Sequence, residues 1–502
     1  MSTLDVPSFG APLNQTSFDA CESLGFKSAR RLLAAAADVP ANLTGKRLHF
    51  IGIGGIGMSA MARIALSRGA IVSGSDLVES DLTRALVERG ATVFVGDHAA
   101  SNVAGVEVVI ISSAIDPANP ELVAARAAGA EVIQRSPFLA RLFAGSNTIG
   151  VTGAHGKTTT TWMISNLLID AEKDPTVLVG GTVKKLGNSN FRVGKGAFFP
   201  SEIDESDGML TSIHPYIAVV TNIDKEHMDT FGTMERLEHA ILTYMKNTRP
   251  DGLIVGCGDD ERVLRLMRES GRRFVTYGHN EGNDLRVDRV RSHGMSMSFK
   301  VQCPAQPELY DGLRFKLPMP GEHNVLNACA ALCIGRELGI DPAVALESLG
   351  NCERVHRRFE IIGEKNNIRV VDDYGHHPTE IKATLKAAKA STKGRLVVAF
   401  QPHRYSRTRS LIAEFQHAFR DADALIVTEI YGAGERPIPG VSGEMMVDAI
   451  TKAGYGLVYF APDQDSLLEL LAKITRSGDT ILTLGAGDIT DIGPSFLSRM
   501  AA

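Results

Sequence analysis

A glycine-rich turn separates a strand-like segment from the hydroxyl-rich start of a helix. The strand-like segment at 147–151 is followed by the run at 153–161, Gly-Ala-His-Gly-Lys-Thr-Thr-Thr-Thr. A strand, a tight glycine turn and a helix start in this order aim backbone N–H groups at phosphates. In such loops the lysine, here Lys157, reaches the β- and γ-phosphates, and the first hydroxyl, here Thr158, holds Mg²⁺. The run therefore predicts a site for a nucleoside triphosphate.

The loop departs from the general phosphate-binding pattern at one position. That pattern places a glycine five residues before Gly156, where this chain has Val151. Gly153 stands nearer to the lysine instead. The loop is therefore a variant, and on its own it leaves the reaction open.

A second glycine-rich turn, nearer the N-terminus, predicts a diphosphate site. Gly52, Gly54 and Gly57 have the spacing G-x-G-x-x-G before an Ala-rich helix at 58–68, and Asp76 follows about twenty residues later. Alone, this fingerprint would suggest NAD, but no hydride-transfer partner is recognisable elsewhere. The narrower prediction is a diphosphate on the helix N-terminus. Glycines that serve only a tight turn are the alternative.

Strand and helix patterns alternate from Lys46 onward, which predicts an α/β protein. A chain of 502 residues is too long for one ordinary core. We expect a Rossmann-like N-terminal domain, a central domain of the P-loop ATPase type and a Rossmann-like C-terminal domain. The expected boundaries are 1–45 for an extension that includes a helix at 23–37, then 46–147, 148–353 and 354–502. Further expectations are a β-meander at 284–317 and C-terminal strands at 368–372, 395–400, 424–428 and 480–484.

Composition argues against several classes of function. A net charge of −5 gives no basic field for nucleic acid. The six cysteines are scattered without a C-x-x-C pair, so no disulfide framework is expected and a reducing cytoplasm fits. No signal peptide is recognisable, and no apolar run approaches the ~20 residues of a membrane span. We expect a cytoplasmic protein without nucleic-acid or membrane partners.

Two polar clusters follow strand-like segments of the central domain. Four carboxylates lie within 202–207, separated by two residues from the apolar strand-like segment 196–199. Sites gather at the carboxyl ends of strands in open α/β sheets, and oxygen ligands suit Mg²⁺, so we favour a metal site over a solvated surface. His227 follows the segment 217–222 and is either a metal ligand or a structural histidine.

Asn324 and Asn327 open an Ala-rich helix and, being three residues apart, share one face of it. An asparagine side chain can pair with both N6 and N7 of adenine. The pair therefore predicts an adenine contact. Capping of the helix by Asn324 is the competing interpretation.

Two polar stretches leave strands of the C-terminal domain, at 372–378 and 400–408. Both bring histidines and arginines to the carboxyl ends of strands, and arginine binds carboxylate or phosphate through paired hydrogen bonds. The stretches predict a site for an acidic substrate. For the adjacent His376 and His377 we favour binding over packing.

Taken together, these residues resemble the Mur ligase family. The likeness runs in unbroken order from Lys46 to the C-terminus. Its most specific parts are Asp-Asp-Tyr-Gly-His-His-Pro-Thr-Glu at 372–380 and Gln-Pro-His-Arg-Tyr-Ser-Arg-Thr at 401–408. The family loop, Gly-Thr-x-Gly-Lys-Thr, also explains the displaced Gly153. The matching blocks are 52–59, 153–161, 202–207, 221–229, 322–327, 372–381 and 400–408.

The resemblance implies an ATP-dependent amide ligase of peptidoglycan precursor synthesis. Such an enzyme would join L-alanine to the muramoyl carboxylate of UDP-N-acetylmuramate. The carboxylate would attack the γ-phosphate of ATP, and the amine would then attack the acyl phosphate. The implied cofactors are ATP and Mg²⁺, the implied partners are the two small-molecule substrates, and a monomer or weak homodimer is expected.

The resemblance also implies roles for single residues. The implied catalytic residues are Lys157, Glu205, His227, Arg358, Asp373, His376 and His377. The implied ATP contacts are Gly153, Ala154, His155, Gly156, Lys157, Thr158, Thr159, Asn324, Asn327 and Arg358, and the implied metal ligands are Thr158, Glu205 and His227. The implied UDP-sugar contacts are Gly52, Gly54, Gly55, Ile56, Gly57, Met58, Ser59, Asp76 and Ser113. The implied contacts of the muramoyl carboxylate and the amino acid are Tyr374, His376, His377, His403, Arg404 and Arg407.

Two features of the mechanism follow from these roles. Arg358 would reach the γ-phosphate from the C-terminal domain, so closure of that domain is expected to assemble the site. A group must also take the proton of the attacking amine. Either His376 or His377 is expected to act as this general base.

The chain departs from the family pattern in several places. Ala154 replaces the usual threonine of the loop, and Trp162 stands where a small residue is common. The residues Asn-Cys-Glu at 351–353 replace the usual Phe-x-Gly before the arginine pair, and the N-terminal extension is longer. None of these changes touches Lys157 or Arg358, so activity is expected to persist.

Three other functions stay open. The first is a recycling ligase that attaches a whole tripeptide to the same UDP-sugar. The second is an NAD-dependent oxidoreductase with an added ATPase-like module. The third is a non-catalytic nucleotide-binding regulator.

Overall fold

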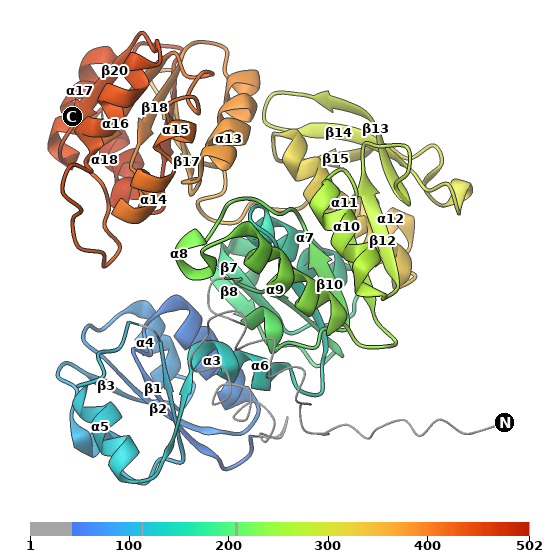
Figure 1. Ribbon diagram of the computed structural model, residues 1–502, viewed down its shortest axis with the longest axis vertical. Helices are drawn as coiled ribbons and strands as arrows, with labels where there is room; N and C mark the ends of the chain where they lie inside the picture. Colours follow the sequence, from blue (N-terminus) through green and yellow to red (C-terminus); the bar gives the residue numbers. More distant parts are fainter. Residues whose placement is uncertain (1–42, 113, 206–208, 501–502) are drawn as a thin grey trace. The chain divides into compact units, whose positions relative to one another are not determined.

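A computed structural model describes residues 43–112, 114–205 and 209–500 (Figure 1). The chain divides into two compact units. The first runs up to Lys157 and adds 172–180 and 189–276, and the second comprises 158–171, 181–188 and the chain from Tyr277. The predicted helix at 23–37, Ser113 and the last carboxylate of the 202–207 cluster lie outside the described residues.

The first sheet is parallel throughout, as expected for a Rossmann-like domain. Its strand order is β3-β2-β1-β4-β5, so the winding reverses beside the central strand β1. Phe50 and Ile51, adjacent in β1, belong to different hydrophobic clusters, because successive side chains of a strand face opposite sides. The strands are β1 (Arg47–Ile51), β2 (Ile71–Asp76), β3 (Thr92–Val95), β4 (Val108–Ile111) and β5 (Glu131–Gln134). The helices are α3 (Ile56–Ser67), α4 (Asp81–Val87), η1 (Ala100–Val103), α5 (Pro120–Ala127) and α6 (Arg135–Phe143).

The next sheet is built around β6 (Asn147–Thr152), the strand that leads into the phosphate loop. It pairs in parallel with β10 (Ile217–Val220) and β9 (Phe198–Glu202). In the first unit the order is β12-β11-β10-β6-β9-β7-β8. The other strands are β7 (Val177–Val183), β8 (Ser189–Arg192), β11 (Leu253–Cys257) and β12 (Phe274–Gly278). The helices are η3 (Met209–Thr211), α8 (Met228–Phe231), α9 (Met234–Lys246) and α10 (Glu261–Ser270).

The second unit contains the β-meander predicted at 284–317. The end of β12 pairs in parallel with β13 (Leu285–Ser292), which pairs antiparallel with β14 (Met297–Gln302). Strand β15 (Phe315–Leu317) completes the meander, and the short helix η4 (Pro307–Tyr310) lies between β14 and β15 in the sequence. The other helices here are α7 (Lys157–Asp170), η2 (Lys184–Leu186), α11 (Glu322–Glu337) and α12 (Pro342–Gly350).

The C-terminal sheet has the order β16-β17-β21-β18-β19-β20, with only β16 antiparallel to its neighbour. The four predicted strands are β17 (Ile368–Asp373), β18 (Leu396–Phe400), β19 (Ala424–Thr428) and β21 (Thr480–Leu484). The prediction missed β16 (Glu360–Lys365) and β20 (Val458–Ala461). These are the two edge strands, and both are too exposed or too short to show a continuous apolar run.

Helices cover both faces of the C-terminal sheet. Val370 and Val371 of β17 belong to separate hydrophobic clusters, one for each face. Among the helices described in this structure, none is both long and apolar enough to cross a membrane. The helices of this sheet are α13 (Pro378–Ser391), α14 (Tyr405–Ser410), α15 (Ile412–Phe415), α16 (Gly443–Lys452), α17 (Gln464–Ile474), η5 (Asp488–Asp491) and α18 (Ile492–Arg499).

Replacing Gly150 of β6 by alanine is expected to destabilise the first unit. The Tyr244 hydroxyl donates to the Gly150 carbonyl at 2.8 Å, and a Cβ at this position would overlap that hydroxyl oxygen. Overpacking of this kind costs about 1–3 kcal/mol, so the midpoint of thermal unfolding in calorimetry should fall. Gly282→Ala is the control, because nothing lies within 4 Å of its added Cβ. Equal midpoints for the two variants would contradict the packing.

Candidate active site

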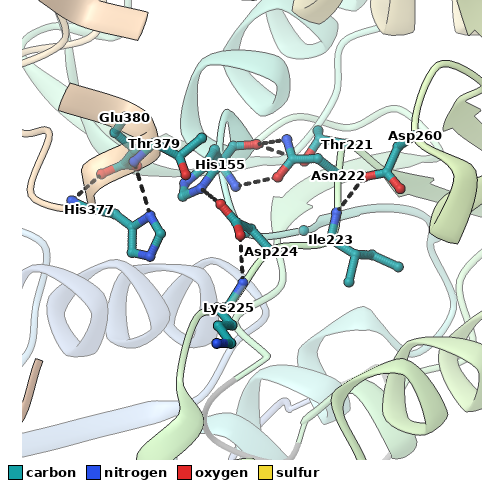
Figure 2. Close-up of polar contacts among 12 residues, drawn as sticks. His155, Thr221, Asn222, Ile223, Asp224, Lys225, Asp260, His377, Thr379 and Glu380 are labelled. Carbon is teal, nitrogen blue, oxygen red and sulfur yellow. Dashed lines mark hydrogen bonds and ion pairs between the residues drawn. The ribbon is translucent and has the colours of Figure 1, made fainter. Parts of the chain in front are cut away.

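The phosphate loop is held by residues that follow β10. Asn222 accepts the backbone N–H of His155 through Oδ1 at 2.9 Å and donates from Nδ2 to the His155 carbonyl at 2.9 Å. The Thr221 hydroxyl donates to the same carbonyl at 2.7 Å. Asp224 Oδ2 lies 3.1 Å from Nε2 of the His155 ring (Figure 2). Residues 221–224 therefore set the shape of the loop.

The displaced glycine of the loop has a structural reason. Gly153 has φ +122°, a conformation that residues with a side chain rarely adopt. A Cβ there would overlap the Thr221 hydroxyl and approach the Asn222 carbonyl to 2.7 Å. Val151, where the general pattern has glycine, is a fully buried residue of β6. The close approach of the loop to β10 thus requires the glycine at 153.

Lys157 and Glu205 form a buried ion pair beside the loop. Lys157 Nζ lies 3.0 Å from Glu205 Oε1 and donates to the Gly153 carbonyl at 2.6 Å. Burial alone would lower the pKa of Lys157, but the carboxylates of Glu205 and Glu202 raise it above its ordinary value. Lys157 is therefore charged at neutral pH. Burial also raises the pKa of the Glu205 carboxyl, against the opposing effect of Lys157.

His227 stands in a strained backbone conformation near these carboxylates. Its φ is +54°, in the left-handed region, and it precedes α8. Its Nε2 lies 3.9 Å from Asp204 Oδ1. Strained non-glycine residues cluster at functional sites, because the surroundings must hold them in place. The conformation favours a site residue over a purely structural histidine.

The glycine turn after β1 is held by Asp76. The Gly54 N–H donates to Asp76 Oδ2 at 2.8 Å, and a Cβ on Gly54 would come within 2.8 Å of the same oxygen. Gly55 precedes α3, and no side chain caps the helix there. N–H groups of an uncapped first turn are suited to an anion.

The other predicted residues of this turn present backbone rather than side chains. Ile56 is exposed, while Met58 and Ser59 are buried, with the Ser59 hydroxyl donating to the Ile56 carbonyl at 3.1 Å. A Cβ on Gly57 would lie 3.3 Å from Nη1 of Arg135, so a guanidinium stands beside this turn. The turn combines backbone donors with a cation, which suits a diphosphate.

Arg358 reaches the start of α7. Its Nη2 donates to the Thr158 hydroxyl at 3.3 Å. The guanidinium carbons of Arg357 and Arg358 each lie 5.0 Å from the ring centre of Tyr374, within the range of a cation–π contact. The structure thus brings together the predicted γ-phosphate arginine and a predicted metal ligand.

Arg357 has a different task. Its Nε donates to Asp372 Oδ2 at 3.2 Å, and its Nη2 donates to the carbonyls of Gly485 and Gly487 at 2.6 and 3.1 Å. Asp372 is fully buried and also accepts the Thr483 hydroxyl at 2.6 Å. This arginine is therefore anchored in the C-terminal sheet, and the next one projects from it.

Asp373, predicted as a catalytic residue, holds two loops together. It accepts the backbone N–H groups of Phe359 and Gly375 at 2.8 and 2.9 Å, and the Thr384 hydroxyl at 3.2 Å. Burial raises the pKa of Asp373 to about 6, although Arg358 opposes the shift. The carboxylate is occupied by its own domain, which favours a positioning role over contact with substrate.

The adjacent histidines 376 and 377 differ in tautomer. His376 Nδ1 lies 3.0 Å from the Tyr374 carbonyl, which only accepts, so the proton sits on Nδ1 and the lone pair on Nε2. His377 caps α13: its Nδ1 accepts the Thr379 N–H at 3.4 Å, which places its proton on Nε2. Glu380 Oε2 accepts the backbone N–H of His376 at 3.1 Å and that of His377 at 3.3 Å. Figure 2 shows the contact with His377. In His376 the nitrogen that could take a proton is Nε2. In His377 it is Nδ1, and that atom already caps α13.

His403 is held neutral beside this pair. Burial lowers its pKa to about 3, with His376 and Arg407 adding to the shift. Arg407 Nη1 donates to His403 Nδ1 at 3.1 Å, so Nε2 carries the proton. The ring stacks on Tyr431, with centres 5.9 Å apart, and its centre is 5.4 Å from that of His376. Arg404, with φ +69°, opens α14 next to this cluster.

Helix capping by Asn324 is the wrong interpretation. The residue before α11 is Gly321, and Asn324 lies inside the helix. Asn324 Nδ2 donates to the Pro320 carbonyl at 2.7 Å, and Asn327 Nδ2 donates to Asn324 Oδ1 at 3.2 Å. The two buried amides form one hydrogen-bonded pair, as their shared face predicted.

Comparison with known proteins assigns the chain to a family. Residues 47–147 match the "Mur ligase family, catalytic domain", 151–335 the "Mur ligase middle domain" and 357–487 the "Mur ligase, glutamate ligase domain". A UDP-N-acetylmuramate–L-alanine ligase of Geobacter sp. (strain M21) is 45% identical over 461 residues, 91% of this chain and 98% of the relative. One of Myxococcus xanthus (strain DK1622) is 45% identical over 454 residues, 90% and 95% of the two chains. The chain belongs to the Mur ligase family.

Solved structures agree with this assignment. The UDP-N-acetylmuramate-alanine ligase of Thermotoga maritima matches with a TM-score of 0.76 and 32% identity, over 91% of this chain and 99% of that one. A murein peptide ligase of Psychrobacter arcticus shares the fold, with a TM-score of 0.66 and 21% identity over 91% and 99% of the chains. The predicted three-domain α/β architecture and the family resemblance are confirmed.

Sequence analysis missed three residues at the sites of this Mur ligase. Asn222 shapes the phosphate loop, Arg135 stands beside the glycine turn, and Tyr431 stacks on His403. Arg135 follows β5 directly and Asn222 comes two residues after the end of β10, so the position after a strand was an available signal. Tyr431 follows β19 less closely and pairs with a residue of another loop, so no local pattern marks it.

Asp373 should make the unfolding free energy of this Mur ligase depend on pH. Its folded pKa of about 6 exceeds the ~3.9 of an unfolded aspartate, so its stabilising contribution is present below about pH 4 and lost as the pH rises through 6. From pH 4 to pH 7, the unfolding free energy of the wild type should fall relative to Asp373→Asn by roughly 2–3 kcal/mol. Urea unfolding followed by fluorescence of the only tryptophan, Trp162, measures this. A difference that is constant with pH would contradict it.

Proposed function

We propose that this Mur ligase joins L-alanine to the muramoyl carboxylate of UDP-N-acetylmuramate in an ATP-dependent step of peptidoglycan precursor synthesis. The observation that carries the proposal is the contact of Arg358 with Thr158, which places a cation at the start of the phosphate-loop helix. The relatives that span almost the whole chain are named for the same ligation. The proposed reaction forms an acyl phosphate with release of ADP, and the amine then displaces phosphate.

The phosphate loop supplies the proposed ATP site. Lys157, kept charged by the carboxylates around it, would neutralise the β- and γ-phosphates, and Arg358 would face the γ-phosphate. Phosphoryl transfer depends mainly on positioning and charge stabilisation, which cations held in place provide. The other proposed ATP contacts are Gly153, Ala154, His155, Gly156, Thr158, Thr159, Asn324 and Asn327.

The carboxylates near Lys157 fit a divalent cation. Glu205 is a buried carboxylate, and His227 stands near Asp204, so hard oxygens and an imidazole are close together. We propose Thr158, Glu205 and His227 as ligands of Mg²⁺. When bound, Mg²⁺ would neutralise charge on the phosphates.

The glycine turn after β1 is the proposed site for the diphosphate of the UDP-sugar. Its donors are the N–H groups at the uncapped start of α3, and Arg135 adds a cation. Asp76 supports the turn through the Gly54 N–H. The turn is therefore shaped before the ligand arrives, which lowers the entropic cost of binding.

The C-terminal cluster is the proposed site of the amine. His376 is the proposed general base, because its lone pair lies on Nε2, whereas His377 uses its own as a helix cap. Neutral His403 would act as a hydrogen-bond donor through Nε2–H. Tyr374, Arg404 and Arg407 complete the proposed substrate contacts.

The alternative functions have less support. In an NAD enzyme the acid after the second strand would bind ribose, but Asp76 accepts the Gly54 N–H. The murein peptide ligase is 21% identical to this chain, against 45% for the L-alanine ligases. A non-catalytic role is disfavoured by the buried pair of Lys157 and Glu205. We further propose a cytoplasmic enzyme that acts as a monomer or weak homodimer.

Replacing Lys157 by alanine should abolish ligation. Phosphate release with UDP-N-acetylmuramate, L-alanine, ATP and Mg²⁺ should fall at least ~100-fold, because the fixed charge at the phosphates is lost. Lys195→Ala removes an exposed lysine of the same unit and should leave the rate unchanged. Undiminished phosphate release by Lys157→Ala would disprove the loop assignment. Phosphate release with L-alanine, L-serine, glycine or the tripeptide as acceptor separates the ligase alternatives. Titration with NADH tests the oxidoreductase alternative.

The two histidines should respond differently to substitution. His376→Ala should lower kcat roughly 10²- to 10⁴-fold, the usual contribution of a general base. His377→Asn should have a much smaller effect, because asparagine can still cap α13. Phosphate-release kinetics at saturating substrates, with helix content checked by circular dichroism, measure both. The reverse order would assign the base to His377.

A further inference from the structure

One face of α7 carries a row of side chains that contact the chain outside the helix. Thr158, Trp162, Asn166 and Asp170 follow one another at intervals of four residues. Residues at this spacing lie above one another on one face of a helix. The first three are buried. The row starts at the residue that Arg358 contacts.

The two contacts nearest the phosphate loop involve the segment that carries Arg358. Arg358 Nη2 donates to the Thr158 hydroxyl at 3.3 Å, and Trp162 Nε1 donates to the Glu353 carbonyl at 2.8 Å. Trp162 is fully buried, and its indole has a single donor, so this carbonyl satisfies it. The hydrogen bond ties the backbone five residues before Arg358 to the helix.

The other end of the row is tied as well. Asn166 Nδ2 donates to the Ser348 carbonyl at 3.0 Å and to its hydroxyl at 2.8 Å. Lys185 Nζ donates to Asn166 Oδ1 at 2.6 Å and to Asp170 at 2.5 Å. The backbone N–H of Lys185 donates to the Glu353 carboxylate at 2.9 Å. Lys185 therefore links the far end of the row to its middle.

The chain at 348–358 thus runs back along α7 towards the phosphate loop. From Asn166 to Thr158 the helix rises by roughly 12 Å, at about 1.5 Å per residue. On the way, the His356 N–H donates to the Thr182 carbonyl at 2.9 Å. The backbone is therefore held at several points before it reaches the arginine.

We propose that the α7 row and the segment 348–358 form a strap that positions the Arg358 guanidinium at the start of α7, with Trp162 and Asn166 as positioning residues. Neither residue would touch substrate, and both would act through Arg358. The inference rests on the proposed function, in which Arg358 faces the γ-phosphate.

The physical reason is the length of the arginine side chain. A long, flexible side chain delivers its charge to one place only if the backbone that carries it is fixed. A misplacement of about 1 Å can cost roughly 100-fold in rate. The strap ties that backbone to α7, the helix whose first turn Arg358 contacts through Thr158.

The test is a double-mutant cycle between Trp162 and Arg358. Trp162→Phe keeps a large ring but removes the N–H donor, and kcat for phosphate release should fall about fivefold with the KM for UDP-N-acetylmuramate unchanged. In an Arg358→Lys background, Trp162→Phe should lower kcat by a further factor of less than about 1.5, because Trp162 acts through the arginine. The proposal would be overturned if the two single substitutions lowered kcat independently, so that their factors multiplied in the double variant. It would also be overturned if Trp162→Phe left kcat unchanged.

Tyr310→Phe is the matched control. The Tyr310 hydroxyl is buried in the same unit and donates to the Leu332 carbonyl at 3.2 Å, away from the strap. The variant removes one buried donor from a backbone carbonyl, as Trp162→Phe does, and should leave kcat unchanged. An equal fall in kcat for both variants would mean a general structural effect and would overturn the proposal.

A second measurement guards against misfolding of the Trp162 variant. Glu353 is exposed, so Glu353→Ala is expected to fold, but it removes the acceptor of the Lys185 N–H. Acrylamide quenching of Trp162 fluorescence should rise in this variant and kcat should fall, while Glu353→Gln, which keeps an acceptor oxygen, should match the wild type. Unchanged quenching and kcat in Glu353→Ala would overturn the strap.

The quenching series needs no substrate. If the wild type releases no phosphate with UDP-N-acetylmuramate, L-alanine and ATP, the proposed function fails. The fluorescence of Trp162 in the two Glu353 variants still decides whether the strap exists, because Trp162 is the only tryptophan of the chain. The two failures are therefore distinguishable.

Discussion

The buried pair of Lys157 and Glu205 is the constraint on which the central domain depends. A buried charge without a partner is strongly destabilising, so each group requires the other. Lys157 follows β6 and Glu205 follows β9, and the parallel pairing of these two strands brings the side chains to within 3.0 Å of each other. The pair therefore links two neighbouring strands of the sheet and keeps the cation of the loop charged, while residues 221–224 shape the loop.

A second constraint acts where the chain enters the C-terminal sheet. Arg357 is held by Asp372 and by two carbonyls of the loop after β21. Arg358, the next residue, points to Thr158 instead. One arginine therefore serves as an anchor so that its neighbour can be placed, and sequence alone could not say which of the pair has which task.

Much of the fold could be predicted because its signals are local. Buried strands such as β18 and β19 are mostly continuous apolar runs in the sequence, and the glycine turns mark helix starts that lack a side-chain cap or need a positive φ. The parts that could not be predicted depend on contacts between distant segments. Asparagine is a common helix-capping residue, but Asn324 lies inside its helix and donates a hydrogen bond to the Pro320 carbonyl. Asp373 and His377 lie in a stretch that reads as substrate-binding, yet their hydrogen bonds hold their own backbone.

The two consecutive aspartates of β17 have an evolutionary consequence. Successive side chains of a strand face opposite sides, so Asp372 serves Arg357 while Asp373 serves the backbone around Phe359. Shifting β17 by a single residue would exchange the two carboxylates and misdirect both arginines at once. Insertions or deletions in this short strand should therefore be absent among active descendants of this chain, even though its loops can vary in length.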